Sequence, residues 1–330
     1  MNIIFATYIA LGFSILFICT ALSYKFNLLD LPNDRKLHKD PTAYTGGIGI
    51  SFIYLLSLKL FNFENSDNFS LIISSSFLIA LVGFIDDKFL LNVGGKLSLQ
   101  ILPIFYLIFI ENIKLNHIGD YGYFKLNLES FSAPFTLICV LFLINAFNYF
   151  DGMDGSLSLT TISVVAILYF LIPDINNKTF LIIILIPIFI FLCFNFSIFN
   201  LPKLFLGDGG SLLLGFLISF LLIYYANQKI VHPILLAWSV VIFVYEFLSL
   251  NIQRIINKKN PFKSGLDHLH HRLFEKTNSI FLTNFYLIII NICLFFIGFL
   301  AFKFINPLGS LIIFIFLFIL FYYLRKNYLK

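Results

Sequence analysis

This chain has few charged residues for its length. Only 12% of its 330 residues are Asp, Glu, Lys or Arg, while 59% are hydrophobic and the mean hydropathy is +0.94. A soluble domain of this size needs more polar residues to cover its surface, so the composition excludes a water-solvated globule and predicts a membrane protein. The net charge of +5 gives no reason to expect a nucleic-acid partner.

The chain also has little cysteine and no linker-like segment. Its four cysteines lie singly inside apolar runs, without the spacing of a metal site, so we expect neither disulfides nor zinc. They are predicted to be packing residues. No low-complexity stretch or clear internal repeat divides the chain, which predicts a single domain over residues 1–330.

What the chain does have is a series of long apolar runs. Their lengths approach what a helix needs to cross a bilayer, which predicts an all-α, polytopic bundle of about 11 transmembrane helices. The first run lacks a basic start and a small-residue cleavage site, so we expect a retained span rather than a signal peptide. The runs cover residues 2–24, 46–60, 70–85, 97–110, 133–147, 157–172, 179–199, 210–226, 232–252, 280–302 and 307–324.

Lysine and arginine gather in alternate breaks between these runs. Such a bias marks the cytoplasmic side, which predicts an external N-terminus and a cytoplasmic C-terminus. Most aspartates and histidines fall in the same breaks. Because ionisable groups are costly in hydrocarbon, their clustering at one interface predicts a polar site there.

Two of these breaks carry the clearest acidic signals. Adjacent carboxylates, Asp86 and Asp87, end one apolar run, and Lys96 follows close enough to reach a phosphate. Adjacent acids repel, which suits a proton acceptor or a metal-linked site, although solvation at a helix end explains them as well. Asp208 lies among glycines before a later span, where it is either a helix cap or a metal ligand near a phosphate.

The segment from 145 to 155 has an oxygen-bearing side chain at every third position. Asn145, Asn148, Asp151 and Asp154 follow this pattern, and we expect Gly152 and Gly155 to end the helix and let the side chains converge. Oxygen ligands without thiols favour a hard ion, Mg²⁺ or Mn²⁺. Packing alone explains these polar residues poorly.

Two basic segments complete the pattern. Residues 268–273 read His-Leu-His-His-Arg-Leu, and on a helix His268, His271 and Arg272 share one face. Their hydrogen-bond donors suit a diphosphate; zinc and a solvated loop are the alternatives. The first cytoplasmic break supplies further cationic donors before the glycine pair at 46–47, whose amides could approach an anion; a plain positive-inside loop is the alternative. These donors are Arg35, Lys36 and His38.

Together and in this order, these segments resemble the polyprenyl-phosphate N-acetylhexosamine-1-phosphate transferases of glycosyltransferase family 4. The His-x-His-His-Arg-Leu form resembles the N-acetylglucosamine branch rather than the muramoyl-pentapeptide branch. The resemblance implies transfer of a sugar 1-phosphate, expected to be GlcNAc-1-phosphate, from a UDP-sugar to undecaprenyl phosphate in a bacterial inner membrane. UMP is the second product. The resemblance implies that this reaction begins the synthesis of an envelope polysaccharide, and it is compatible with a homodimer.

The resemblance also implies roles for the residues. Asp208, Asn148 and Asp151 are expected to hold Mg²⁺, with Mn²⁺ as the alternative. Asp86, Asp87, Asp151 and Asp154 are the candidate catalytic acids, of which Asp86 or Asp87 would deprotonate or orient the lipid phosphate. The diphosphate is expected to be neutralised by Lys96, His268, His270, His271 and Arg272, and substrate to be bound by Arg35, Lys36 and His38.

Some positions depart from the family pattern. Glu246 stands where an aspartate is often found, and Ser156 follows the glycine where leucine is usual. The alternatives keep the chemistry but change the sugar, to UDP-MurNAc-pentapeptide or another UDP-N-acetyl sugar. A secondary transporter is the rival class, but it favours ionisable groups near the bilayer midplane rather than at span ends.

Overall fold

The structure, a computed structural model, describes residues 2–32, 40–62, 67–260, 265 and 267–328. The chain forms two compact units, and each is described by itself. Unit 1 contains residues 1–112 and 174–220, and unit 2 contains residues 113–173 and 221–330. The single domain expected from the sequence stays a prediction.

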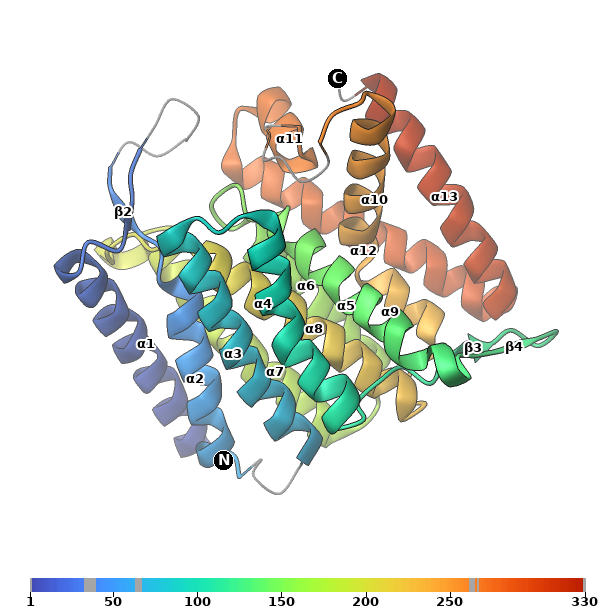
Figure 1. The fold of residues 1–330 in the computed structure, drawn as a ribbon, viewed down its shortest axis with the longest axis horizontal. Helices are drawn as coiled ribbons and strands as arrows, with labels where there is room; N and C mark the ends of the chain where they lie inside the picture. The colour runs from blue at the N-terminus through green and yellow to red at the C-terminus, as the bar shows by residue number, and fades with distance from the viewer. Residues whose placement is uncertain (1, 33–39, 63–66, 261–264, 266, 329–330) are drawn as a thin grey trace. The chain divides into compact units, whose positions relative to one another are not determined.

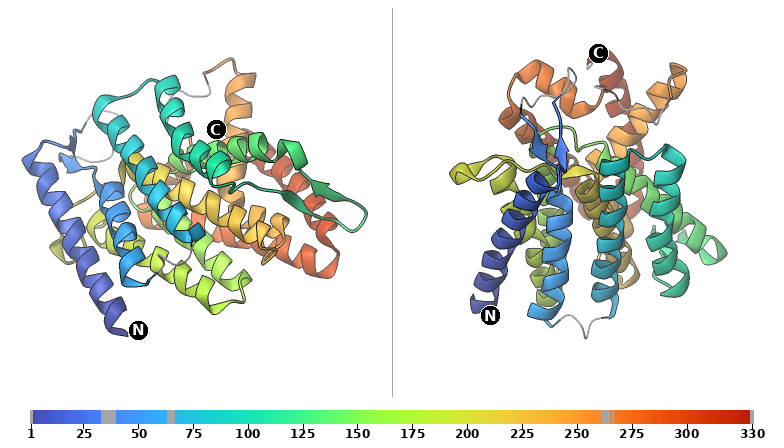
Figure 2. Two further views of the ribbon diagram at one scale, coloured as in Figure 1. Left: turned by 60° about the horizontal axis from the view of Figure 1, so that its bottom comes forward. Right: turned by 60° about the vertical axis from the view of Figure 1, so that its left-hand side comes forward.

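Unit 1 is built around neighbouring helices in chain order. Helices α1, α2 and α3 pack side by side, α4 packs on α3, and α7 packs on α1 and α2 (Figures 1 and 2). The elements are α1 (Asn2–Lys25), β1 (Leu29–Asp30), β2 (Thr42–Ala43), α2 (Gly46–Leu60), α3 (Asp67–Phe89), α4 (Val93–Phe105), the π-helical turn η2 (Tyr106–Ile110), α7 (Ile175–Asn195), the 3₁₀ turn η4 (Ile198–Asn200) and α8 (Gly207–Asn227), which continues into unit 2.

Unit 2 is organised around one long helix, α12. It packs against α6, α9, α10, α11 and α13, while α5 packs on α10. The elements are β3 (His117–Asp120), β4 (Lys125–Asn127), the 3₁₀ turn η3 (Glu129–Phe131), α5 (Ser132–Asn148), α6 (Ser156–Leu171), α9 (Pro233–Ser239), α10 (Val241–Ile256), α11 (Leu269–Thr277), α12 (Ile280–Phe304) and α13 (Pro307–Tyr328).

The helices agree with a polytopic membrane protein. Among the described residues, eight helices are long and apolar enough to cross a bilayer, or nine if one bent pair is a single span. The predicted runs at 46–60 and 157–172 are helices α2 and α6, of 15 and 16 residues. At 1.5 Å per residue they are about 22–24 Å long, shorter than the roughly 30 Å hydrocarbon core. The count of eleven spans and the orientation stay predictions.

The run at 232–252 is not one continuous helix, contrary to the simple expectation. It is divided into α9 and α10, which meet at an angle of 73°. Asn291 of α12 accepts a hydrogen bond from the Ile242 amide (3.4 Å) and donates to the Ser239 carbonyl (3.3 Å). A break in an apolar environment must have its backbone groups satisfied internally, and this one asparagine does so from both sides.

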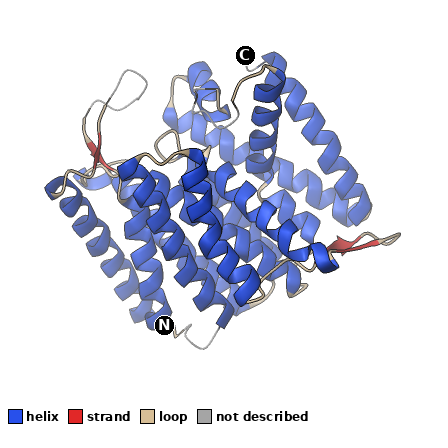
Figure 3. Cartoon of the chain, in the orientation of Figure 1, coloured by secondary structure: helices blue, strands red, loops and turns tan. Residues whose placement is uncertain are grey.

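The sequence did not predict the two small antiparallel sheets drawn in red in Figure 3, which are β1–β2 and β3–β4. In the first, Leu29 pairs with Ala43 and Asp30 with Thr42. Ala43 also forms a parallel bridge with Leu204. This bridge places the segment before α8 beside the start of α2, close to the acidic residues described next.

The four cysteines are free thiols, as expected. Cys19, Cys139 and Cys193 are partly buried, which agrees with a packing role, whereas Cys293 is exposed.

Candidate active site

Three helices of unit 1 converge on the Lys96 ammonium group. Asp86 ends the apolar part of α3, and Lys96 lies in the first turn of α4, whose start is capped by the Asn92 side chain accepting from the Gly95 amide (2.8 Å). Lys96 Nζ lies 2.7 Å from Asp86 Oδ2 and also forms an ion pair with Asp208 of α8. Asp86 therefore faces a cationic group, and its predicted catalytic role stays a prediction.

The neighbouring carboxylate, Asp87, has a different set of partners. Its two oxygens accept hydrogen bonds from the backbone amides of Asp208 (3.1 Å) and Gly209 (3.3 Å) at the start of α8. These amides have no partner within their own helix, so Asp87 acts as its cap, and a carboxylate is favoured at a helix N-terminus. The Asp208 side chain, in the first turn of the same helix, forms an ion pair with Lys96.

Glycines allow this close approach of α2, α3 and α8. A Cβ on Gly83 would lie 2.4 Å from the Asp208 carbonyl carbon, and one on Gly47 would lie 1.9 Å from the Gly210 nitrogen. Gly207 has φ of +71°, and a Cβ there would lie 2.6 Å from Asp87 Oδ2. Larger residues at these positions would separate the backbones that hold the carboxylates together.

The proposed role of the glycine pair at the start of α2 is wrong. Its amides do not face an anion, because the Gly46 amide donates to the Phe205 carbonyl (3.0 Å) and the Gly47 amide to the Leu206 carbonyl (2.8 Å). These bonds fix the segment before α8 against α2. The other predicted binding residues of this break, Arg35, Lys36 and His38, lie outside the described residues.

In unit 2, the helix break predicted near Gly152 and Gly155 is confirmed. Helix α5 ends at Asn148, α6 begins at Ser156, and Gly155 has φ of +73°. The Ser156 hydroxyl donates to the Phe150 and Met153 carbonyls (2.5 and 2.9 Å), which closes the connecting loop on itself. Asp151 and Asp154 lie half-buried in this loop.

The loop lies against the histidine segment. A Cβ on Gly152 would lie 2.3 Å from His270 Nε2 and 3.1 Å from His271 Nε2. The three histidine rings are neighbours: the centroids of His268 and His270 are 5.6 Å apart, and those of His270 and His271 are 4.2 Å apart. The structure thus brings together two segments that are over a hundred residues apart in the sequence. The helix begins at Leu269, so His268 is its N-cap residue and not part of the helix, contrary to the expectation that His268 shares a helix face with His271 and Arg272.

Several polar atoms of this segment are buried without a protein partner. Among the described residues, His268 Nδ1, His270 Nε2 and Arg272 Nη1 accept or donate no hydrogen bond. Native proteins rarely leave buried polar groups unpaired, so such a cluster indicates a place for a polar ligand. Three atoms from neighbouring side chains suit a ligand with several oxygens.

Burial also decides the charge of these histidines. Burial, assisted by the positive charge of Arg254, lowers the pKa of His268 to about 3, and burial lowers the pKa of His270 well below its ordinary value. Both rings are therefore neutral at pH 7 without a ligand. Without a ligand, these two rings therefore offer hydrogen bonds rather than positive charge. The role of this segment at a diphosphate stays a prediction.

The predicted metal ligands fit a hard ion by their chemistry. No group of three or more His, Cys, Asp or Glu is arranged to hold a metal ion in the described part of the chain. Mg²⁺ does not require such a group, because one or two carboxylates together with substrate phosphates usually suffice. The carboxylates of Asp86 and Asp208 already converge on one cationic group. Asp208, Asn148 and Asp151 stay predicted ligands.

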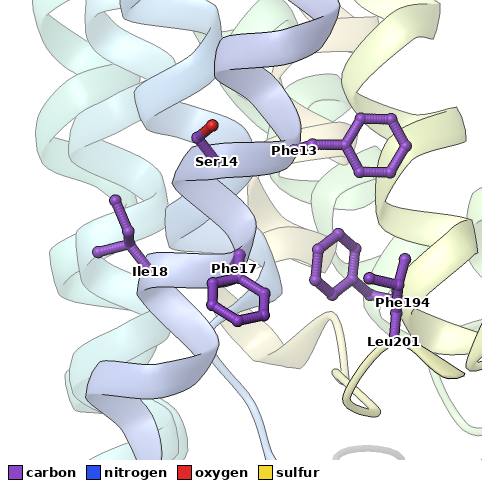
Figure 4. Close-up of a pocket in the computed structure, with 6 residues that line it drawn as sticks. All are labelled: Phe13, Ser14, Phe17, Ile18, Phe194 and Leu201. Atoms are coloured by element: carbon purple, nitrogen blue, oxygen red, sulfur yellow. The ribbon is translucent and has the colours of Figure 1, made fainter.

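A separate apolar pocket lies in unit 1 between α1 and the region around the end of α7 (Figure 4). Its lining contains no candidate site residue and only one polar side chain, so it provides no groups for the predicted chemistry. The lining residues are Phe13, Ser14, Phe17, Ile18, Phe194 and Leu201.

The fold and these side chains define a class of protein. Many apolar helices, with carboxylates and a lysine at helix ends of unit 1 and a histidine–arginine segment at a helix end of unit 2, are typical of a membrane enzyme that acts on phosphate esters. Residues 69–226 match the model of the family described as Glycosyl transferase family 4.

Curated relatives agree with this match. Three proteins named undecaprenyl-phosphate alpha-N-acetylglucosaminyl 1-phosphate transferase are similar over most of the chain. The Yersinia pestis protein is 26% identical, covering 79% of this chain and 73% of its own length. The Escherichia coli K12 protein is 25% identical (79% and 72%), and the Haemophilus influenzae protein is 26% identical (81% and 77%). Residues 69–226 thus resemble glycosyl transferase family 4, and the chain is a distant homologue of these phosphoglycosyltransferases.

Proposed function

We propose that this enzyme transfers N-acetylglucosamine 1-phosphate from UDP-N-acetylglucosamine to undecaprenyl phosphate. An oxygen of the lipid phosphate attacks the phosphorus that bears the sugar, the bond to the bridging oxygen of UMP breaks, and UMP leaves. The names of the three relatives and the His-x-His-His-Arg-Leu segment support this choice of substrates. The match of residues 69–226 to an enzyme family gives the transporter alternative no support.

The observation that carries the proposal is the cluster of buried, unpartnered nitrogens at His268, His270 and Arg272. A diphosphate has acceptor oxygens for all three, and an arginine is well suited to a phosphate because its planar donors can pair with two oxygens. We propose that this segment binds the diphosphate of the UDP-sugar, with Gly152 leaving the space that the ligand and the rings require.

The carboxylates of unit 1 are proposed to serve the lipid phosphate and the metal. Asp86 or Asp87 accepts a proton from the lipid phosphate or orients it, and Lys96 contacts a phosphate group. Asp208, with Asn148 and Asp151, holds Mg²⁺, which when bound offsets the charge of the diphosphate as its bond breaks. Asp154 remains a candidate acid. The protein then needs to supply mainly positioning and charge compensation.

The cellular setting is part of the proposal. The relatives are bacterial, and the apolar helices are those of a multi-pass membrane protein. We propose a location in the bacterial cytoplasmic membrane with the polar helix ends on the cytoplasmic side, where UDP-sugars are available. Initiation of an envelope polysaccharide is the corresponding pathway step, and a homodimer is compatible with it.

The test is UMP release by purified protein in detergent, with undecaprenyl phosphate, Mg²⁺ and a panel of UDP-sugars. We expect release with UDP-N-acetylglucosamine and its loss with EDTA. Release only with another UDP-N-acetyl sugar or with UDP-MurNAc-pentapeptide would retain the chemistry and replace the substrate. No release with any UDP-sugar from folded protein would refute the proposal.

Two variants test the roles of the carboxylates. Asp208→Asn and Asp87→Asn are each expected to abolish transfer while leaving a folded, membrane-inserted protein. Asp120→Asn makes the same chemical change at an exposed carboxylate on β3 and is expected to keep wild-type activity. Near-normal turnover in either of the first two variants would remove that residue from the mechanism.

A further inference from the structure

Helix α13 carries an arginine that is almost completely buried. The side chain of Arg325 is 1% exposed and that of Glu246, on α10, is 2% exposed. Arg325 Nε lies 2.9 Å from Glu246 Oε2, and Arg325 Nη2 lies 3.2 Å from Glu246 Oε1. The two side chains thus form a two-point ion pair within unit 2.

The same two side chains also hold the backbone on both sides of His268. Glu246 Oε1 accepts a hydrogen bond from the Leu269 amide (2.9 Å), and Arg325 Nη2 donates to the Asp267 carbonyl (2.6 Å). Asp267 and Leu269 are the immediate neighbours of His268 in the chain. The remaining donor group of Arg325, Nη1, donates to Gln253 Oε1 (2.6 Å), so all three guanidinium nitrogens are used.

The Asp267 side chain is held independently. Arg254 donates to it from Nε (3.0 Å) and Nη2 (2.5 Å). Burial raises the pKa of Asp267, but the Arg254 guanidinium outweighs this effect and holds the pKa at about 2. Arg272 Nε donates to the Asp267 carbonyl as well (3.2 Å). The backbone before His268 is therefore bound by two arginines and its carboxylate by a third.

A buried ion pair is a weak source of stability, because a well-packed apolar pair of similar size often does as well. What it provides is a fixed geometry, since a planar guanidinium whose three nitrogens are all hydrogen-bonded has one orientation. Here that geometry is transmitted to the two peptide units that set the position of His268. A lysine could supply the charge but not the same fork of donors.

We propose that Arg325 and Glu246 are positioning residues that orient His268 and the start of α11 toward the diphosphate of the UDP-sugar. They act through the backbone and do not touch the substrate. This role rests on the proposed function of the histidine segment. Helix α13 carries none of the residues that the sequence motifs indicate, yet through this contact it affects the binding of one substrate.

The experiment compares two variants of the full-length enzyme in detergent. In the double variant Glu246→Gln, Arg325→Met both charges are removed, so no unpaired charge is buried, and the introduced amide oxygen keeps an acceptor for the Leu269 amide. The control is Lys326→Met, which removes a positive charge from the exposed neighbouring position of α13. KM is measured separately for the UDP-sugar and for undecaprenyl phosphate, together with kcat and the thermal unfolding midpoint.

For the double variant we expect KM for the UDP-sugar to rise at least about tenfold and kcat/KM to fall by about 100-fold, since displacements near 1 Å have such effects. KM for the lipid should be unchanged, and Lys326→Met should match the wild type. Wild-type KM values for both substrates would overturn the inference. So would an equal rise of both KM values with a lowered unfolding midpoint, which indicates a general structural role.

A second readout separates this inference from the proposed function. If the wild type releases UMP from no UDP-sugar, the proposed function fails, and hydrogen–deuterium exchange of the peptide at 267–277 then tests the positioning alone. We expect faster exchange in the double variant and no change in Lys326→Met. Exchange as slow as in the wild type would overturn the positioning role whatever the activity.

Discussion

Replacing Gly83 by alanine tests whether close helix packing sets the position of the carboxylates. The new Cβ would lie 2.4 Å from the carbonyl carbon and oxygen of Asp208 and 2.5 Å from the Gly209 nitrogen. Ordinary contacts begin near 3.4 Å, so the backbone at the start of α8 must move by about 1 Å. None of these atoms belongs to a flexible side chain that could turn away. Asp208, and with it the ion pair to Lys96, must move too.

Two effects on stability oppose each other in this variant. Alanine in a helix is favoured over glycine by about 1 kcal/mol, whereas overpacking costs about 1–3 kcal/mol. Because backbone atoms provide the clash, we expect the overpacking cost to exceed the gain and the unfolding midpoint to fall. A displacement of this size near the reacting groups is expected to lower kcat/KM by about 100-fold.

Gly94→Ala is the matched control for Gly83→Ala. It lies in the first turn of α4, and a Cβ there would meet only Asn92 Oδ1 at 3.6 Å, which is an ordinary contact. We expect this variant to be at least as stable as the wild type, because it gains helix propensity without a clash, and to keep wild-type activity. The assay is UMP release and thermal unfolding for both variants. A Gly83→Ala enzyme as stable and active as the wild type, or an equal loss in Gly94→Ala, would refute the reasoning.

Two further predictions concern unit 2. Burial lowers the pKa of His268 to about 3 and the pKa of His270 well below its ordinary value. The unfolded chain, whose histidines have a pKa near 6.5, therefore binds more protons between these values, so stability rises with pH up to about 6.5 and is lost on acidification. The unfolding midpoint of the wild type should be lower at pH 5 than at pH 7, and this fall should be smaller in His270→Gln. An equal fall in the wild type and the variant would contradict the lowered pKa of His270. Asn291→Leu removes the hydrogen bonds to the Ile242 amide and the Ser239 carbonyl at the buried break between α9 and α10. Each group left unpaired lowers the free energy of unfolding by about 1–3 kcal/mol, so the unfolding midpoint should fall. The control is Cys293→Leu, at an exposed position on the same helix, which should not lower the midpoint. Equal midpoints for the two variants would remove the role given to Asn291.

The helix break near Gly152 illustrates how far local sequence carries the prediction. A glycine pair after an apolar run predicted the end of α5, and the structure ends it at Asn148. The structural requirement for glycine at position 152, however, is not the end of the helix. A side chain there would occupy the space of the His270 ring, a contact between residues far apart in the chain. Sequence pattern locates a break, but it does not reveal what lies opposite.

The glycine pair at 46–47 shows that a sequence pattern can also suggest a wrong role when the contacting residues are unknown. Glycines at a helix start are typical of anion sites, and this analogy led to a wrong role. Their amides instead bind carbonyls of the segment before α8. Equally, the motifs gave no sign of Arg325, because one arginine near the end of an apolar helix is an ordinary membrane-interface residue in any sequence. Its part in positioning His268 depends on a pairing with Glu246 across 79 residues of chain.

The sequence by itself determined the helical, membrane-spanning class of the fold and indicated which residues are candidates for the site. Apolar runs of bilayer length become helices because lipid leaves the backbone no other partners, and acids and histidines at helix ends follow from the cost of burying charge. Only the tertiary structure decided which partner each group has. It directs Asp86 to Lys96 and Asp87 to the start of α8, and it buries the histidines until they are neutral. Hydrogen bonds and pKa values depend on neighbours a few ångströms away, and those neighbours come from distant parts of the chain.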